Sequence, residues 1–169
     1  VIETGLEVLE SIETLAKRIN LNVSIGDLQV ERLNADEAQG AALQISPGSG
    51  LVQVTRVIHA ENRPVAYLVD LLPEEYLSPE ELNQGFSGSV LDLLLMHEGH
   101  RLTESKTDIR AVSASAEIAR ALQMQRGDVL LLFIAQLFAG DGSIIDYSYS
   151  YFLPGYFRFH VVRRISTSH

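Results

Sequence analysis

The chain of 169 residues is long enough for one domain with a substantial core, and 46% of its residues are hydrophobic. A formal net charge of -9 argues against direct binding to a nucleic-acid backbone, because that needs clustered Lys and Arg side chains. The absence of cysteine excludes disulfides and thiolate metal sites, and no signal peptide or membrane-spanning apolar run is evident. We expect a single globular domain over residues 1–169 that makes no contact with a membrane.

The first predicted element is a helix that ends near Asn20. Its apolar residues recur every three or four positions, as on one stripe of a helix: Ile2, Leu6, Leu9, Ile12, Leu15 and Ile19. The sequence begins with Val1 in the middle of this pattern. We interpret that beginning as a cut that leaves out an N-terminal partner domain. Gly26 then breaks the pattern, and a strand of mixed polarity is predicted over 28–33.

The next elements are a helix and a pair of strands. Asn34 and Glu37 have the spacing of a capping box, which predicts a helix that runs to about Leu43. Strands follow at about 50–60 and 64–72.

Two further helix starts follow, each marked by a serine with an acid three residues later. They lie at 78–81 and 89–92, and Gly99 ends the second helix. A strand over 103–113 and a helix over 115–123 come next.

The C-terminal part is predicted to complete the sheet. The run 129–139 is apolar on both faces, which predicts a central strand covered from both sides. A glycine turn at 140–142 leads into a returning strand with tyrosines on one face and a polar row on the other. The tyrosine face holds Tyr147, Tyr149 and Tyr151, and the polar face holds Asp146, Ser148, Ser150 and Phe152. A final strand over about 158–165 closes the sheet.

Part of the sequence is repeated. Each copy predicts a short helix, a turn containing glycine, and a long apolar strand that doubles back and ends in Leu-Pro. Two α-β-β units predict one sheet with a pseudo-two-fold axis and a cavity where the halves meet. Eight positions recur at an offset of 79: Ala35/Ala114, Ala42/Ala121, Leu43/Leu122, Gln44/Gln123, Ile45/Met124, Gly48/Gly127, Leu51/Leu130 and Ala60/Ala139.

Arg56 is the most informative single residue. It shares a strand face with aliphatic side chains, so its guanidinium needs an acceptor that offsets the loss of water. A three-residue loop over 61–63 would place it opposite Leu68 and diagonal to Asp70, whereas a two-residue loop would put Asp70 on the other face. Two interpretations remain open: an Arg56–Asp70 ion pair, or a guanidinium that binds an anionic ligand.

Other polar residues also allow two interpretations. Ser89 stands at a helix start, where free N–H groups attract anions, although capping alone explains a serine there. The row of Asp146 and Ser150 either faces solvent or lines a cavity, and the tyrosines on the opposite face form core or dimer contacts.

The sequence predicts no metal, cofactor or catalytic residue. His97 and His100 are separated by the glycine that ends their helix, and no third ligand is evident. The chain also has no Gly-x-Ser-x-Gly elbow and no Walker or dinucleotide glycine pattern.

Four segments together resemble the UTRA domain, the effector-binding domain of GntR-type transcription regulators of the HutC subfamily. The resemblance covers about residues 4–165 and implies an α+β fold similar to chorismate lyase, in which helices flank an antiparallel sheet. It also implies a non-enzymatic cytoplasmic sensor of a small metabolite. Such a sensor is a homodimer that reaches DNA only through an N-terminal winged-helix domain, which this chain lacks. The segments are VTRVIHAENRPVAYLVDLLP, FSGSVLDLLLMHEGHRL, SASAEIARALQMQRGDVLLL and DGSIIDYSYSYFLPGYFRFHV.

The same resemblance implies the ligand-binding residues. In relatives that sense phosphorylated sugars, one group holds the anionic end of the effector, a second closes around the remainder, and a serine reaches in from the linker helix. Arg56 and Ser89 match the group that holds the anionic end. Asp146 and Phe152 match the group that closes around the remainder, and Ser11 matches the serine of the linker helix. Ser150 and Asp70 join them as neighbours on the same strand faces.

Three departures from those relatives make this pocket less polar. Ile58 stands where they have a second arginine, Leu68 where they have a glutamate, and Phe152 where they have a tyrosine. We therefore expect an anionic but more apolar metabolite, such as a carboxylate, in place of a sugar phosphate. Two alternatives stay open: a chorismate-lyase-like enzyme in which Arg56 grips a carboxylate and Asp146 is acid or base, and a dimerisation module with a collapsed cavity.

Overall fold

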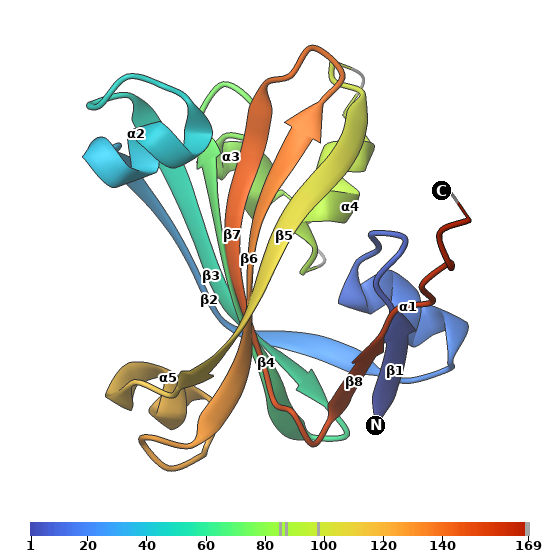
Figure 1. Cartoon of the computed structure of the whole chain (residues 1–169). Coiled ribbons are helices and arrows are strands. Elements are labelled where there is room, and N and C mark those ends of the chain that lie inside the picture. The colour runs from blue at the N-terminus through green and yellow to red at the C-terminus, as the bar shows by residue number, and fades with distance from the viewer. Residues whose placement is uncertain (85, 87, 98, 168–169) are drawn as a thin grey trace.

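The structure, a computed structural model, describes residues 1–84, 86, 88–97 and 99–167. Within these residues, six strands form an antiparallel sheet in the order β2-β3-β4-β7-β6-β5 (Figure 1). The strands are β2 (Val23–Asn34), β3 (Gly50–Ala60), β4 (Arg63–Pro73), β5 (Leu102–Ser113), β6 (Val129–Ala139) and β7 (Ile144–Phe152). The expected α+β class, with helices flanking an antiparallel sheet, is confirmed.

Short helices lie on both faces of this sheet. On one face, α2 and α5 lie at opposite ends, and on the other lie α1, α3 and α4 (Figure 1). A separate parallel pair of strands, β1 and β8, lies beside α1 and joins the two terminal regions. The bounds are α1 (Ile12–Arg18), α2 (Glu37–Leu43), α3 (Pro79–Asn83), α4 (Val90–Leu95), α5 (Ala116–Ala121), β1 (Ile2–Gly5) and β8 (Phe157–His160).

The sequence repeat corresponds to the two halves of the sheet. One half is β2-α2-β3-β4, the other is β5-α5-β6-β7, and they meet where β4 pairs with β7. The turns make equivalent hydrogen bonds: the Ala35 N–H donates to the Ser49 carbonyl and the Ala114 N–H to the Asp128 carbonyl, both at 2.8 Å. The duplication is therefore confirmed, and each unit has one more strand than the predicted α-β-β.

The β3-β4 hairpin decides the register around Arg56. Glu61 and Asn62 have φ angles of 52° and 62°, which is the left-handed conformation of a two-residue type I′ turn. Of the two loop lengths that the sequence left open, the structure contains the two-residue one. A bulge between this turn and Arg56 shifts the register by one residue, so that Arg56 still lies opposite Leu68, with Asp70 on the same face.

The N-terminal segment is not one helix, so that prediction was wrong in its first half. Residues 2–5 form β1, and Ile2 is fully buried in the same cluster as Phe157, which is its pairing partner on β8. Leu9, in contrast, is 53% exposed. Parallel pairing with the far end of the chain leaves no local signal, and the spacing of the apolar residues imitated a helical stripe.

Three smaller predictions also need correction. Gly26 lies inside β2, beside a register shift, and does not precede the strand. The α2 cap is Asp36, whose capping box is completed by Gln39, and not Asn34. The last strand ends at His160 and pairs with β1, so it does not close the main sheet.

The central strands of the sheet are β4 and β7, not β6. Val129, the first residue of β6, is 57% exposed, because β6 lies next to the edge strand β5 and is not covered from both sides along its whole length. Fully buried residues pack on both faces: Val54 and Leu72 towards α3 and α4, and Val57 and Leu130 towards α5. Among the described residues, no helix has the length and apolar character needed to cross a membrane.

Candidate ligand-binding site

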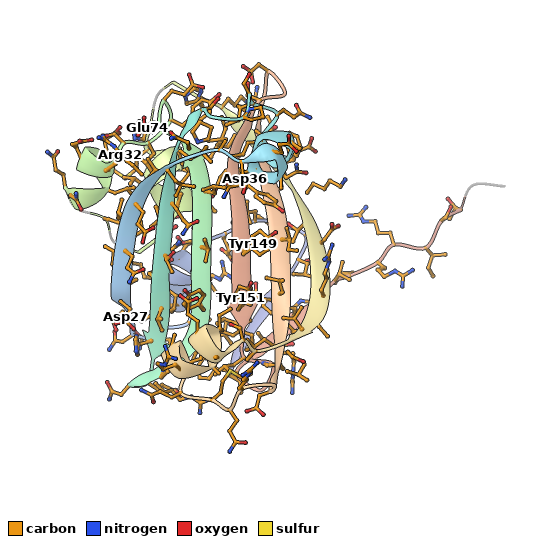
Figure 2. The ribbon with its side chains drawn as sticks, turned by 90° about the vertical axis from the view of Figure 1, so that its left-hand side faces the viewer. Asp27, Arg32, Asp36, Glu74, Tyr149 and Tyr151 are labelled. Atoms are coloured by element: carbon orange, nitrogen blue, oxygen red, sulfur yellow. The ribbon has the colours of Figure 1, made fainter. Side chains whose placement is uncertain are left out.

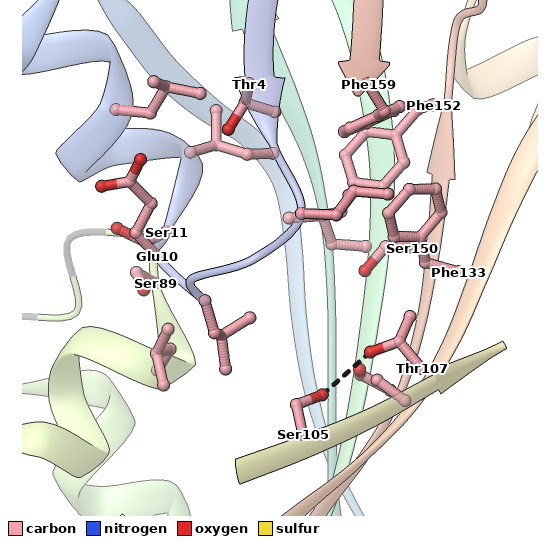
Figure 3. Close-up of a pocket in the computed structure, with 18 of the residues that line it drawn as sticks. Thr4, Glu10, Ser11, Ser89, Ser105, Thr107, Phe133, Ser150, Phe152 and Phe159 are labelled. Atoms are coloured by element: carbon pink, nitrogen blue, oxygen red, sulfur yellow. Dashed lines mark hydrogen bonds between the residues drawn. The ribbon is translucent and has the colours of Figure 1, made fainter. Parts of the chain in front are cut away.

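A cavity of about 500 Å³ lies between the sheet and the N-terminal segment of residues 4–13 (Figure 3). Strands β3 to β7 contribute its floor, and the start of α4 contributes one wall. All seven residues predicted from the sequence line this cavity: Ser11, Arg56, Asp70, Ser89, Asp146, Ser150 and Phe152. The structure therefore brings them together, and their role in binding a ligand stays a prediction.

At the polar end of the cavity, Arg56 is held by protein groups. Its Nη1 donates a hydrogen bond to Oδ2 of Asp70, and its Nε donates to the carbonyl oxygen of Gly88 at 2.9 Å. The guanidinium carbon lies 5.7 Å from the centre of the Phe86 ring. The side chains of Arg56 and Asp70 are 5% and 10% exposed. Of the two interpretations of Arg56, the cross-strand ion pair is the one that the structure contains.

Asp146 lies beside this ion pair and is 6% exposed. Burial raises the pKa of its carboxyl well above the ordinary value of 3.8, and the charge of Asp70 and a hydrogen bond with that side chain raise it further. The Arg56 guanidinium has a smaller, opposite effect. Asp146 therefore retains its proton to a higher pH than an ordinary aspartate, and the protonated carboxyl donates to Asp70.

Two helix caps meet at the wall of the cavity. The Ser89 Oγ accepts the N–H of Asp92 at 2.9 Å and caps α4. The Ser11 Oγ accepts the N–H of Thr14 at 3.0 Å, caps α1, and donates to Oδ2 of Asp92 at 2.7 Å. The capping interpretation of Ser89 is confirmed, and Ser11 joins the start of α1 to the first turn of α4.

The opposite end of the cavity is aromatic. The rings of Phe133 and Phe152 meet edge to face with centroids 5.0 Å apart, and they lie 4.6 and 5.1 Å from that of Phe159. Hydroxyls of Ser105 and Thr107, 2.9 Å apart, lie on the adjacent edge strand β5. Figure 3 shows the rings on the side of the cavity away from Ser11 and Ser89. The cavity therefore suits a ligand with one polar and one apolar part.

Glu13 on α1 belongs to the site and was missed by the sequence analysis. Its Oε1 is buried and has no hydrogen-bond partner among the described residues. The carboxylate lies directly over Gly88, because a Cβ built on that glycine would be 2.8 Å from Oε1. Burial is the largest influence and raises the pKa of Glu13, while its own backbone and Arg56 lower it. The sequence analysis considered only the apolar stripe of this segment, and the position of Glu13 depends on how α1 docks over Gly88.

No metal site adjoins the cavity within the described ranges, which hold no group of three or more His, Asp or Glu side chains placed to bind an ion. The Nε2 of His97 lies 2.8 Å from Oε2 of Glu81, which gives that imidazole a structural contact.

The tyrosines lie on the other face of the sheet, as predicted. Figure 2 shows Tyr149 and Tyr151 in the open middle of that face, between α2 and α5. The hydroxyls of Tyr147 and Tyr149 are 3.0 Å apart, and burial together with this hydrogen bond raises the pKa of Tyr147 to about 12. A second hollow of about 250 Å³ lies beside them, lined by Ala38, Gln39, Gln53, Val69, Leu71, Tyr147 and Tyr149.

Comparison with solved structures shows a shared fold. PhnF from Mycobacterium smegmatis is 20% identical, with a TM-score of 0.85 over 98% of this chain and 72% of that chain. The isolated effector domain of PhnF is also 20% identical, with a TM-score of 0.86 over 97% of this chain and 100% of that chain. A GntR-family transcriptional regulator from Enterococcus faecalis V583 is 22% identical, with a TM-score of 0.73 over 83% and 100% of the two chains.

Comparison of sequences places the chain in a family. No curated protein matches it. The UTRA domain model, in contrast, matches residues 20–158, which include the whole main sheet and the helices α2 to α5. The chain belongs to the UTRA domain family.

Proposed function

We propose that this chain is the effector-sensing domain of a bacterial transcription regulator, and that a small metabolite binds in the cavity beneath residues 4–13. The cavity carries this proposal. Its volume of about 500 Å³ lies within the range of small-molecule sites, roughly 300–1,000 Å³. One of its ends is polar, the other is aromatic, and the N-terminal segment covers it.

The position of that segment suggests how binding is transmitted. Residues 4–13 line the cavity and follow directly on the first residues of the chain, before which we propose a winged-helix domain of the HutC type. A metabolite that prefers one arrangement of this segment would shift the regulator towards that arrangement, by no more than its difference in affinity. The regulator would act in the cytoplasm as a homodimer, with DNA contacts made by the preceding domain.

The effector is proposed to carry an anionic group. Arg56 and the Ser89 hydroxyl at the polar end are the groups that would face it, and α4 begins there. Leu68 and Phe152 line the remainder and favour an apolar body, as in an organic carboxylate. We propose that this domain binds its effector without converting it. Turnover of chorismate by the purified chain would instead support the alternative function, a chorismate-lyase-like enzyme.

A variant that fills the cavity tests the proposal. Ser150 lies on the cavity floor, so Ser150→Phe should abolish the rise in melting temperature that a bound metabolite causes in a thermal-shift screen. Ser113→Phe, which makes the same substitution at an exposed strand end outside the cavity, should leave that rise unchanged. Equal responses from the two variants would place binding elsewhere, and a screen without any response would leave the collapsed dimerisation module as the better account.

A further inference from the structure

The cavity is lined by more acidic than basic side chains. Among the described residues, Arg56 is the single Lys, Arg or His side chain on its surface. Five acidic residues line the same cavity: Glu7, Glu10, Glu13, Asp70 and Asp146. Asp70 matches the charge of Arg56, Arg18 matches that of Glu10, and Asp146 retains its proton. Within the part of the chain that the structure describes, Glu7 and Glu13 therefore remain as lining acids without a Lys or Arg partner. A ligand with only negative charge would be opposed by this surplus.

In two of these carboxyl groups, one oxygen lacks a hydrogen-bond donor. Oε1 of Glu13 and Oδ1 of Asp146 are both buried without a donor from the described residues. The hydroxyls of Ser11 and Thr14 at the start of α1 both donate to Asp92, at 2.7 and 3.4 Å. A buried acceptor without a partner is destabilising, so a ligand that brings N–H donors gains affinity here.

Glu13 is the better placed of the two to meet a cation. Asp146 retains a proton that it donates to Asp70, and in that state it carries no negative charge to attract a cation. Glu13 instead reaches in from α1 over Gly88, a residue whose missing side chain leaves the carboxylate at the cavity wall. Since none of the described residues donates to its Oε1, a ligand in the cavity can supply the missing donor.

We propose that the effector is a zwitterion, and that Glu13 binds its cationic group, such as an ammonium, while its anionic group faces Ser89 and Arg56. This inference rests on the proposed function and adds the chemical class of the ligand. An ammonium brings three N–H donors and a full charge, so its hydrogen bond to a carboxylate is stronger than a neutral one. The apolar body of the ligand lies against Phe133 and Phe152.

Matched compounds separate the zwitterion from its parts. We would compare L-phenylalanine with 3-phenylpropanoate and 2-phenylethylamine, and 5-aminopentanoate with pentanoate and pentylamine, by thermal shift and calorimetry on the purified chain. In at least one trio, the zwitterion should raise the melting temperature more than either partner. In Glu13→Gln, the ratio of Kd between carboxylate and zwitterion should fall by about tenfold or more, as expected for the loss of a charge-assisted hydrogen bond.

Glu10→Gln is the matched control. Glu10 also lines the cavity, but its carboxylate already pairs with Arg18 through hydrogen bonds of 2.5 and 2.6 Å, so this variant should keep the preference for the zwitterion. A carboxylate that binds as tightly as its zwitterion, with a ratio unchanged in Glu13→Gln, would overturn the inference and leave the proposed function intact. No response from any compound in either trio would count against the proposed function itself.

Discussion

At the scale of single residues, local alternation was sufficient to predict which side chains share the cavity, but not what they contact. Arg56 and Asp146 face the cavity because they lie on the same face of the sheet. Side chains alternate between the two faces along a strand, so the face of each residue can be predicted from its neighbours in the sequence. The pairing of Arg56 with Asp70 depends on a bulge that the sequence did not reveal. Glu13 depends on the docking of α1, which arises from contacts between distant segments.

The protonation of Asp146 predicts how stability depends on pH. In the unfolded chain this carboxyl ionises near its ordinary pKa of 3.8, whereas burial holds its pKa well above that value in the folded protein. The folded state then binds a proton that the unfolded state has lost, so stability falls as pH rises from 3.8 towards the folded pKa. In Asp146→Asn, the amide would donate to Asp70 without any titration.

We expect urea unfolding to show a smaller loss of stability between about pH 5 and about pH 8 in Asp146→Asn than in the wild type. Asp141→Asn is the control, because a hydrogen bond from the Ser143 N–H lowers the pKa of this exposed carboxyl and its contribution has the opposite sign. Parallel pH profiles for the wild type and Asp146→Asn would show that Asp146 is ionised in the folded protein.

At the scale of elements, the predictions succeeded where a start or a turn is encoded locally. Ser78 and Ser89 each accept a backbone N–H three residues later, as their spacing predicted. The helix prediction failed at residues 2–5 for the opposite reason, because β1 exists only through its pairing with β8. Helix starts are thus readable from a few neighbouring residues, whereas strands that depend on remote partners are not.

The duplicated turn provides a test of equivalence between the two halves. Gly48 and Gly127 occupy matching positions with φ angles of 89° and 92°, and a Cβ on either would meet no heavy atom within 4 Å. Replacing either glycine by alanine should therefore cost only the strain of holding an alanine at a positive φ angle, roughly 1–2 kcal/mol. Gly48→Ala and Gly127→Ala should lower the free energy of unfolding by similar amounts in urea titrations.

Gly155→Ala is the control for this pair, since its Cβ would also lie in open space but its φ is not positive. It should change the free energy of unfolding by less than either turn variant. A large loss in one copy and none in the other would mean that the two turns do not have equivalent energetic roles.

At the scale of the whole molecule, the two faces of the sheet differ in what covers them. The face with α1, α3 and α4 forms the cavity, and the N-terminal segment closes it. The face with α2 and α5 leaves its middle strands without a covering helix (Figure 2). Alternation along β7 predicted this division, because it separates the row of Asp146 and Ser150 from the row of tyrosines. Separate faces allow a ligand and a second subunit to be bound at once.

We propose that the tyrosine face forms the homodimer. Tyr147 and Tyr149 meet edge to face at 5.3 Å, and Tyr151 does so with Tyr67 at 6.1 Å, all four being half-buried in one copy. Tyrosine is enriched at interfaces because its ring buries apolar area while its hydroxyl finds a polar partner. The two equivalent halves meet at the middle of this face, and a patch with internal two-fold symmetry is suited to self-association.

Tyr149→Lys should therefore convert a dimer into a monomer, because an ammonium at the centre of the face would be desolvated without a partner. Sedimentation velocity of the purified chain at micromolar concentration measures this change. Thr107→Lys places the same charge on the opposite, cavity-bearing face of the sheet, and this variant should still sediment with the mass of a dimer. A wild-type chain that sediments as a monomer, or a Tyr149→Lys variant that remains dimeric, would exclude the tyrosine face as the interface. In that case α2 and α5 would border a surface open to another partner.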